Sequence, residues 1–179
     1  MGEAATRWLQ VVGFSGVGKT RVLAALAARM TARGERVGAI KFSHHPLEPD
    51  AKDTGRLLAA GTRAGLLVGA DGFLFRGSGG TGVPEWFWRV AADWDWVLVE
   101  GGRHLATPKV VLGSGSWPPV RGVVLASAGP DPPLAPYHCR ARLPAEAEDV
   151  AAWVDRWRHV CSVTLEAVRR GVRDDDGER

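Results

Sequence analysis

Residues 13–20 read GFSGVGKT and match the pattern G-x-x-x-x-G-K-[ST], in which a glycine-rich turn joins a strand to a helix. The apolar residues 8–12 before the motif predict a buried strand, and residues 22–30 after it are rich in helix formers, with their large apolar side chains on one stripe. A loop in this position presents backbone N–H groups and the positive end of a helix dipole to an anion. The pattern therefore predicts a loop that binds the phosphates of a nucleoside triphosphate.

The same motif predicts the role of each of its polar side chains. We expect Lys19 to reach the β- and γ-phosphate oxygens, and the Thr20 hydroxyl to coordinate Mg²⁺. The residues expected to contact the nucleotide in this loop and directly after it are Gly13, Ser15, Gly16, Val17, Gly18, Lys19, Thr20 and Arg21.

Strand and helix signals alternate along most of the chain. Residues 36–41 follow a glycine that ends the first helix and complete a strand–helix–strand unit. Further strands are expected at 66–68, 72–75, 96–100, 110–112 and 120–125, and helices at 84–92 and 146–168. This alternation predicts an α/β P-loop NTPase fold of three layers, with a mostly parallel sheet and helices on both faces. We expect one nucleotide-binding domain over residues 1–170 and a charged, disordered tail over 171–179.

Composition excludes several classes of function. The formal net charge is only +3 and the basic residues are scattered, which argues against nucleic acid as a partner. No apolar run approaches the roughly 18 residues that a membrane span needs, and charged residues interrupt the N-terminal segment, which argues against a signal peptide. The two cysteines, Cys139 and Cys161, are too few for a disulfide framework. We therefore expect a cytoplasmic protein.

An acidic side chain follows the buried strand at residues 96–100. Glu100 ends this apolar run and precedes two glycines. Because ligands of open α/β sheets bind at the carboxyl ends of the strands, we expect Glu100 to share one site with Thr20 and Mg²⁺. Lys19 and Glu100 are the candidate catalytic residues. Asp95 begins the same strand, so it lies at the opposite end and has a structural role.

Polar residues cluster after the second strand, in the segment that faces the nucleotide phosphates in phosphate-loop folds. We expect Lys41, His44 and Lys52 to contact nucleotide, and Asp53 to join the Mg²⁺ shell. Zinc binding by His44 and its neighbour His45 is disfavoured, because successive side chains of an extended segment diverge.

The chain contains eight tryptophans. Several lie at helical spacing, which fits either a large core or an apolar surface that is buried by self-association. The sequence leaves these two interpretations open.

Four blocks of the sequence together resemble the MobB family of molybdopterin-guanine dinucleotide biosynthesis adapters. They are the phosphate loop, K-F-S-H-H at 41–45, A-K-D-T at 51–54 and V-E-G-G-R at 99–103. The family patterns are K-H-T-H-H, G-K-D-[ST] and V-E-G-[FY]-K, and a proline–lysine pair follows here at 108–109. The departures of this chain from them include Phe42, Ser43 and Gly102, and it lacks the aspartate that follows the family's last core strand.

The resemblance implies a homodimeric GTP-binding protein with weak GTPase activity. It also implies partners: a MobA-type guanylyltransferase that joins GMP to molybdopterin, and other molybdopterin-processing enzymes. Two other functions stay open: a phosphate-loop kinase that uses ATP on a small molecule, and a scaffold that uses nucleotide only as a switch. No N-K-x-D guanine motif is present, so the residues alone do not choose GTP over ATP.

Overall fold

The computed structural model describes residues 6–43, 60, 64–70, 72–77, 83–113, 120–128, 149, 152–154, 158–161 and 168–169. The chain forms two compact units, which we call the sheet unit (residues 1–43 and 83–179) and the hairpin unit (residues 44–82). The single domain over residues 1–170 stays a prediction, as does the tail over 171–179.

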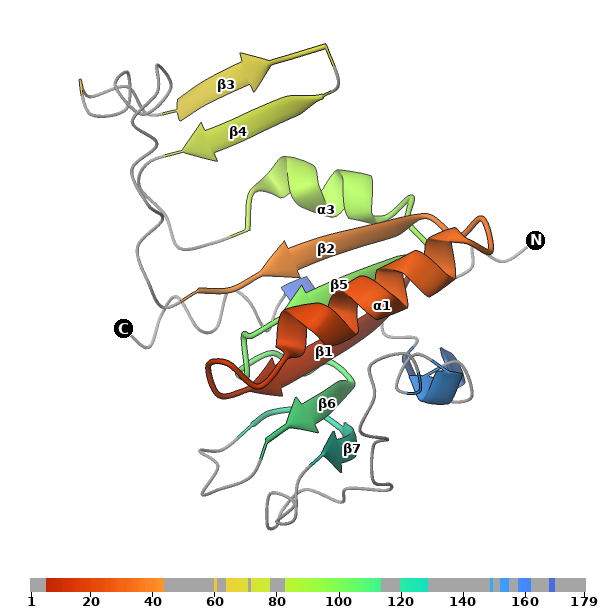
Figure 1. Ribbon diagram of the computed structural model, residues 1–179. Helices are drawn as coiled ribbons and strands as arrows, with labels where there is room; N and C mark the ends of the chain where they lie inside the picture. Colours follow the sequence, from red (N-terminus) through yellow and green to blue (C-terminus); the bar gives the residue numbers. More distant parts are fainter. Residues whose placement is uncertain are drawn as a thin grey trace. The chain divides into compact units, whose positions relative to one another are not determined.

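A five-stranded sheet forms the centre of the sheet unit (Figure 1). Its strands are β1 (Arg7–Gly13), β2 (Val37–Lys41), β5 (Trp96–Glu100), β6 (Lys109–Leu112) and β7 (Val124–Ala128). They lie in the order β2-β5-β1-β6-β7, and every pairing is parallel. Strands β1, β5 and β6 are nearly continuous apolar runs, as expected for strands that are covered on both faces.

Helices cover both faces of this sheet, which confirms the predicted three-layer α/β fold. Helix α1 (Lys19–Thr31) packs its apolar stripe on one face, together with Trp153, Val154 and Cys161 from the C-terminal region. Helix α3 (Glu85–Ala91) packs on the other face. The strands divide their side chains between the two, because successive residues of a strand point to opposite faces: Leu98 contacts the α1 layer, whereas Val97 and Val99 contact the α3 layer.

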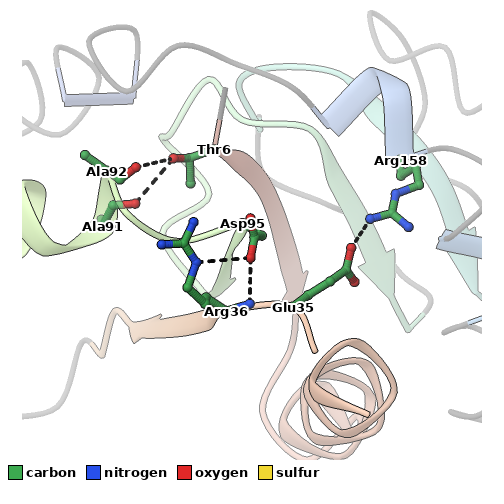
Figure 2. Close-up of polar contacts among 7 residues, drawn as sticks. All are labelled: Thr6, Glu35, Arg36, Ala91, Ala92, Asp95 and Arg158. Atoms are coloured by element: carbon green, nitrogen blue, oxygen red, sulfur yellow. Dashed lines mark hydrogen bonds and ion pairs between the residues drawn. The ribbon is translucent and has the colours of Figure 1, made fainter. Parts of the chain in front are cut away.

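Polar contacts fasten the amino ends of the strands (Figure 2). Asp95 accepts hydrogen bonds from Arg36, from its backbone N at 2.7 Å and from its side-chain Nε at 3.4 Å. This contact confirms the structural role expected for Asp95. The Thr6 hydroxyl, just before β1, donates to the carbonyls of Ala91 at 3.3 Å and Ala92 at 3.5 Å. These bonds join the end of α3 to the start of the sheet.

Arg158 and Glu35 form an ion pair near this end of the sheet (Figure 2). The pair links the 3₁₀ helix η1 (Arg158–Cys161) to the turn that precedes β2. The guanidinium of Arg158 also lies over the ring of Trp96, 5.6 Å from its centroid.

The hairpin unit contains two antiparallel strands, β3 (Ala64–Val68) and β4 (Phe73–Gly77). The backbone N of Gly69 donates to the carbonyl of Gly72 at 2.8 Å and closes the turn. Both strands and the turn between them match the sequence prediction.

The strand expected at residues 120–125 was placed too early, because β7 begins only at Val124. Before it, the backbone N of Arg121 donates to the carbonyl of Arg103 at 3.0 Å, in the connection between β5 and β6, whereas the carbonyl of Val123 accepts from Lys109 N at 2.9 Å. Of the helix expected at 146–168, the structure describes helical residues at 149 and 152–154, then η1, and helical residues again at 168–169.

Candidate nucleotide-binding site

Three neighbouring strands end at the same edge of the sheet, and each delivers a predicted site residue there. Strand β1 runs into the phosphate loop, β5 ends at Glu100, and β2 ends at Lys41. The register pairs Glu100 with Val11 on one side and with Lys41 on the other. Because the strands are parallel and adjacent, their carboxyl ends meet, as the sequence analysis expected.

The phosphate loop leads directly into α1. Gly18 forms the N-cap of the helix with a φ of 88°, a left-handed conformation that a side chain would disfavour. Gly13 is required for a different reason, since a Cβ there would lie 2.7 Å from both the Leu112 carbonyl oxygen and a Val17 methyl. The Lys19 ammonium donates to the Phe14 carbonyl at 2.7 Å, so it lies at the loop itself.

The side chains of Thr20 and Glu100 meet at the start of α1. The Thr20 hydroxyl donates to Oε2 of Glu100 at 2.8 Å. Oε1 of the same carboxylate lies 3.1 Å from the ammonium of Lys41. Glu100 is only 8% exposed, whereas Thr20 is exposed. The carboxylate is therefore held in place from both sides while its partner hydroxyl remains accessible.

The surroundings of Glu100 keep it ionised. Burial alone would raise the pKa of this carboxyl, but the hydrogen bonds from Thr20 and Lys41, and the charges of Lys41 and Lys19, outweigh that effect. The net result is a pKa below the usual value for glutamate. At neutral pH the site therefore presents a carboxylate beside a hydroxyl.

This pair of oxygen ligands fits Mg²⁺. Mg²⁺ is bound in proteins through one or two carboxylate or hydroxyl oxygens together with water and substrate phosphates. The ammonium at 3.1 Å shows that the carboxylate lies where a cation is accommodated. Thr20 and Glu100 are the residues that would hold the ion, which would neutralise charge on the nucleotide phosphates.

Several predicted site residues lie outside the part of the chain that the structure describes. They are His44, Lys52 and Asp53, and the same holds for His45. Of the remaining predicted contacts, Ser15, Gly16 and Arg21 are exposed, and Val17 is partly buried against the α1 layer. Among the described residues, no group of three or more His, Cys, Asp or Glu side chains is placed to hold a metal ion.

Three buried polar side chains beneath the site were not predicted from the sequence. Gln10 and Thr107 are fully buried and hydrogen-bonded to each other at 2.7 Å, and Lys109 is also fully buried. The sequence did contain one signal, a single glutamine inside the apolar run of residues 8–12. A buried glutamine amide requires hydrogen-bond partners, so its presence in this run indicates a polar contact. Lys109 appeared only as part of the proline–lysine pair of the family pattern.

Comparison with known proteins gives a consistent result. The sequence model of the family "MobB: Molybdopterin guanine dinucleotide synthesis protein B" matches residues 8–117. The chain is 33% identical over 116 residues to the molybdopterin-guanine dinucleotide biosynthesis adapter protein of Haemophilus influenzae. That match covers 58% of this chain and 61% of the relative, so the chain spans about three-fifths of the curated relative's length.

Solved structures share the fold. A MobB homologue from Bacillus stearothermophilus superposes with a TM-score of 0.56 and 20% identity, covering 85% of this chain and 97% of that one. MobB of Bacillus subtilis gives 0.60 and 21%, covering 82% and 96%. In the described part of the chain, no helix is long and apolar enough to cross a membrane. With the phosphate loop, the acid at the end of β5 and a family match over more than half of its length, the chain belongs to the MobB family.

Proposed function

We propose that this protein binds GTP with Mg²⁺ and acts as an adapter in the biosynthesis of the molybdenum cofactor. The observation that carries the proposal is the 2.8 Å contact between Thr20, the last residue of the phosphate loop, and Glu100. A hydroxyl and a carboxylate at the start of a phosphate-binding helix are the protein ligands that a Mg²⁺–nucleotide complex requires. Membership of the MobB family supports a guanine nucleotide as the ligand of this site, and it supports molybdopterin as the compound whose conversion the protein assists.

The proposed partner is a MobA-type molybdopterin guanylyltransferase in the cytoplasm, which attaches GMP to molybdopterin. The adapter would assist that enzyme and would hydrolyse GTP slowly by itself. We expect slow hydrolysis because Lys19, Thr20 and Glu100 are assigned here to phosphate and metal, and none of these three is assigned to orient the attacking water. An arginine supplied by a partner raises such rates by about 10³–10⁵-fold.

Titration calorimetry with GTP and with ATP, each with excess Mg²⁺ and with EDTA, tests the proposal. We expect a clear preference for GTP, and we expect Glu100→Gln to weaken binding with Mg²⁺ more than binding with EDTA. Equal losses under both conditions would contradict the metal role of Glu100. A preference for ATP with rapid, acceptor-dependent turnover would instead favour a small-molecule kinase, and binding without any turnover would favour a nucleotide-switch scaffold.

We also propose that the protein is a homodimer, and the hairpin unit supports this. Leu66 lies opposite Phe75 in the register and Val68 lies opposite Phe73, so these four apolar side chains share one face. They are 60%, 41%, 71% and 68% exposed, respectively. A contiguous exposed apolar face of this kind marks a surface for association with a protein. A second copy of the chain is the occupant that we propose for this face.

Light scattering after size-exclusion chromatography tests the dimer. We expect a mass of twice 19.2 kDa for the unmodified protein and a monomer for Val68→Asp. Val123→Asp is the matched control, because Val123 is 51% exposed but belongs to the sheet unit. A monomeric unmodified protein, or a Val68→Asp protein that stays dimeric, would contradict the proposal.

A further inference from the structure

Gln10 lies in the middle of β1, and its side chain points away from α1. It contacts the turn that follows Glu100. Its side chain is fully buried, and its amide nitrogen donates to the carbonyls of both Gly101 and Gly102. The Thr107 hydroxyl donates to the amide oxygen of Gln10 at 2.7 Å. The two carbonyls can only accept, so they fix the NH₂ group of Gln10 toward the turn, and the Thr107 hydroxyl holds the amide from its oxygen end.

The opposite side of this turn is closed by Phe42. Gly101 and Gly102 have φ values of 77° and 62°, so both adopt the left-handed conformation. A Cβ on Gly101 would lie 2.7 Å from the Phe42 carbonyl oxygen, and one on Gly102 would lie 2.8 Å from the Phe42 ring. The turn is therefore held between the Phe42 backbone and ring on one side and the Gln10 amide on the other.

We propose that Gln10, oriented by Thr107, is a positioning residue that fixes the Glu100 carboxylate for Mg²⁺–nucleotide binding. This inference rests on the proposed metal role of Glu100. Gln10 touches neither nucleotide nor metal, and it acts through the two residues that directly follow Glu100 in the chain.

The reason is that Glu100 is the last residue of β5, so the turn after it constrains its backbone together with the pairings to Val11 and Lys41. The backbone of Glu100 is held on one side by the bond from Phe42 N to its carbonyl, at 2.9 Å. The next residue is held by the bond from Gly101 N to the Val11 carbonyl, at 3.1 Å. The carbonyls of Gly101 and Gly102 are held by Gln10. Without that amide, the Gly101 carbonyl loses this donor and the Gly102 carbonyl keeps only the bond from Leu105 N, at 3.0 Å, so the turn relaxes.

A small shift of the turn is enough to affect the site. The contact between Thr20 and Glu100 is a single hydrogen bond of 2.8 Å, and a metal ion must be bound by both side chains at once. Residues that orient metal ligands from behind typically contribute about 10–100-fold to metal affinity. Phosphate contacts made by the loop backbone and Lys19 do not depend on the turn, so nucleotide binding without Mg²⁺ is expected to stay unchanged.

The test measures GTP affinity with excess Mg²⁺ and with EDTA for four variants of the full chain. Gln10→Leu removes both donors at similar size, and Thr107→Val removes only the hydroxyl that orients the amide. Thr6→Val is the matched control, because the buried Thr6 hydroxyl bonds backbone carbonyls at the amino end of the same strand. Glu100→Gln reports separately on the metal role itself.

We expect Gln10→Leu and Thr107→Val to weaken binding with Mg²⁺ by about tenfold, and to change binding with EDTA by less than about twofold. Thr6→Val should lower the melting temperature and leave both affinities unchanged.

If Glu100→Gln shows the selective loss while both test variants bind as the unmodified protein does, the positioning role is overturned and the proposed function stands. Equal losses with Mg²⁺ and EDTA in the test variants also overturn it. If Glu100→Gln shows no selective loss, the proposed function itself fails. Should Gln10→Leu not fold, Thr107→Val decides between the same outcomes.

Discussion

Replacing the buried lysine of β6 by methionine should change how the stability of the protein depends on pH. Lys109 is fully buried, and its ammonium donates to the Leu105 carbonyl at 2.6 Å. Burial lowers the pKa of Lys109 from 10.5 to about 7. Methionine fills a similar volume without a charge, so Lys109→Met removes the ionisation and leaves the packing nearly intact.

The pKa shift gives the sign and size of the effect. In the unfolded chain Lys109 keeps its proton up to pH about 10.4, whereas in the folded protein it releases the proton near pH 7. Between these two values the unfolded state binds more protons, so stability rises with pH, by at most about 1.4 kcal/mol per pH unit. The charged lysine costs the folded state about 5 kcal/mol below pH 7, and between pH 7.5 and 9.5 about 2–3 kcal/mol of that cost is relieved.

Urea denaturation of both proteins at several values of pH between 7 and 9.5 measures this. The free energy of unfolding of the unmodified protein, relative to Lys109→Met, should rise by about 2–3 kcal/mol from pH 7.5 to 9.5. The comparison cancels the opposite contribution of Cys161, whose pKa burial raises to about 12 and which is present in both proteins. A difference between the two proteins that does not change with pH would refute the assignment of a low pKa to Lys109.

Three other substitutions test single features of the fold and the site. Lys19→Ala should abolish GTP binding in calorimetry and leave the melting temperature unchanged, and retained affinity would remove the phosphate role of this lysine. Gly38→Ala should lower the free energy of unfolding in urea by about 1–3 kcal/mol, because its Cβ would overlap the ring of Trp94, and an unchanged value would contradict that packing. Asp95→Asn should cost up to about 1 kcal/mol at neutral pH. The backbone and side-chain hydrogen bonds from Arg36 lower the pKa of Asp95, so its contribution is present above pH about 4 and is lost as pH falls below that. If the difference in the free energy of unfolding between the unmodified protein and Asp95→Asn is the same at pH 3 as at pH 7, this assignment is contradicted.

The sequence predicted the parts of the site that local patterns determine. The phosphate loop follows from its residue pattern, and Glu100 follows from an acid at the end of an apolar run. The meeting of Thr20 and Glu100 could be expected as well, because parallel strands deliver their carboxyl ends to one edge. The contact of Lys41 with the same carboxylate follows from β2 lying next to β5, and strand order is a tertiary property that the residue pattern does not contain.

Other features depend on contacts between segments far apart in the chain. β7 begins later than the strand-forming side chains of Val120 and Val123 suggest. Arg121 bonds to Arg103 in the connection between β5 and β6, and it is the Val123 carbonyl that accepts a bond from β6, at Lys109 N. The role of Gln10 could not be predicted from the sequence for the same reason, since its partners lie more than 90 residues later in the chain.

The connection between β5 and β6 explains why polar side chains stand inside an apolar sheet. Parallel strands are usually joined by a crossover of about a dozen residues or more, which contains a helix and so satisfies its own backbone. Here only residues 101–108 join β5 to β6, which lie on either side of β1. The connection makes one backbone bond of its own here, from Leu105 N to the Gly102 carbonyl at 3.0 Å, and its buried carbonyls take further donors from elsewhere. Gln10 supplies them to Gly101 and Gly102, and Lys109 supplies one to Leu105. The charge buried at Lys109 and the amide buried at Gln10 are therefore two consequences of one short connection, and that connection begins at the acid of the nucleotide site.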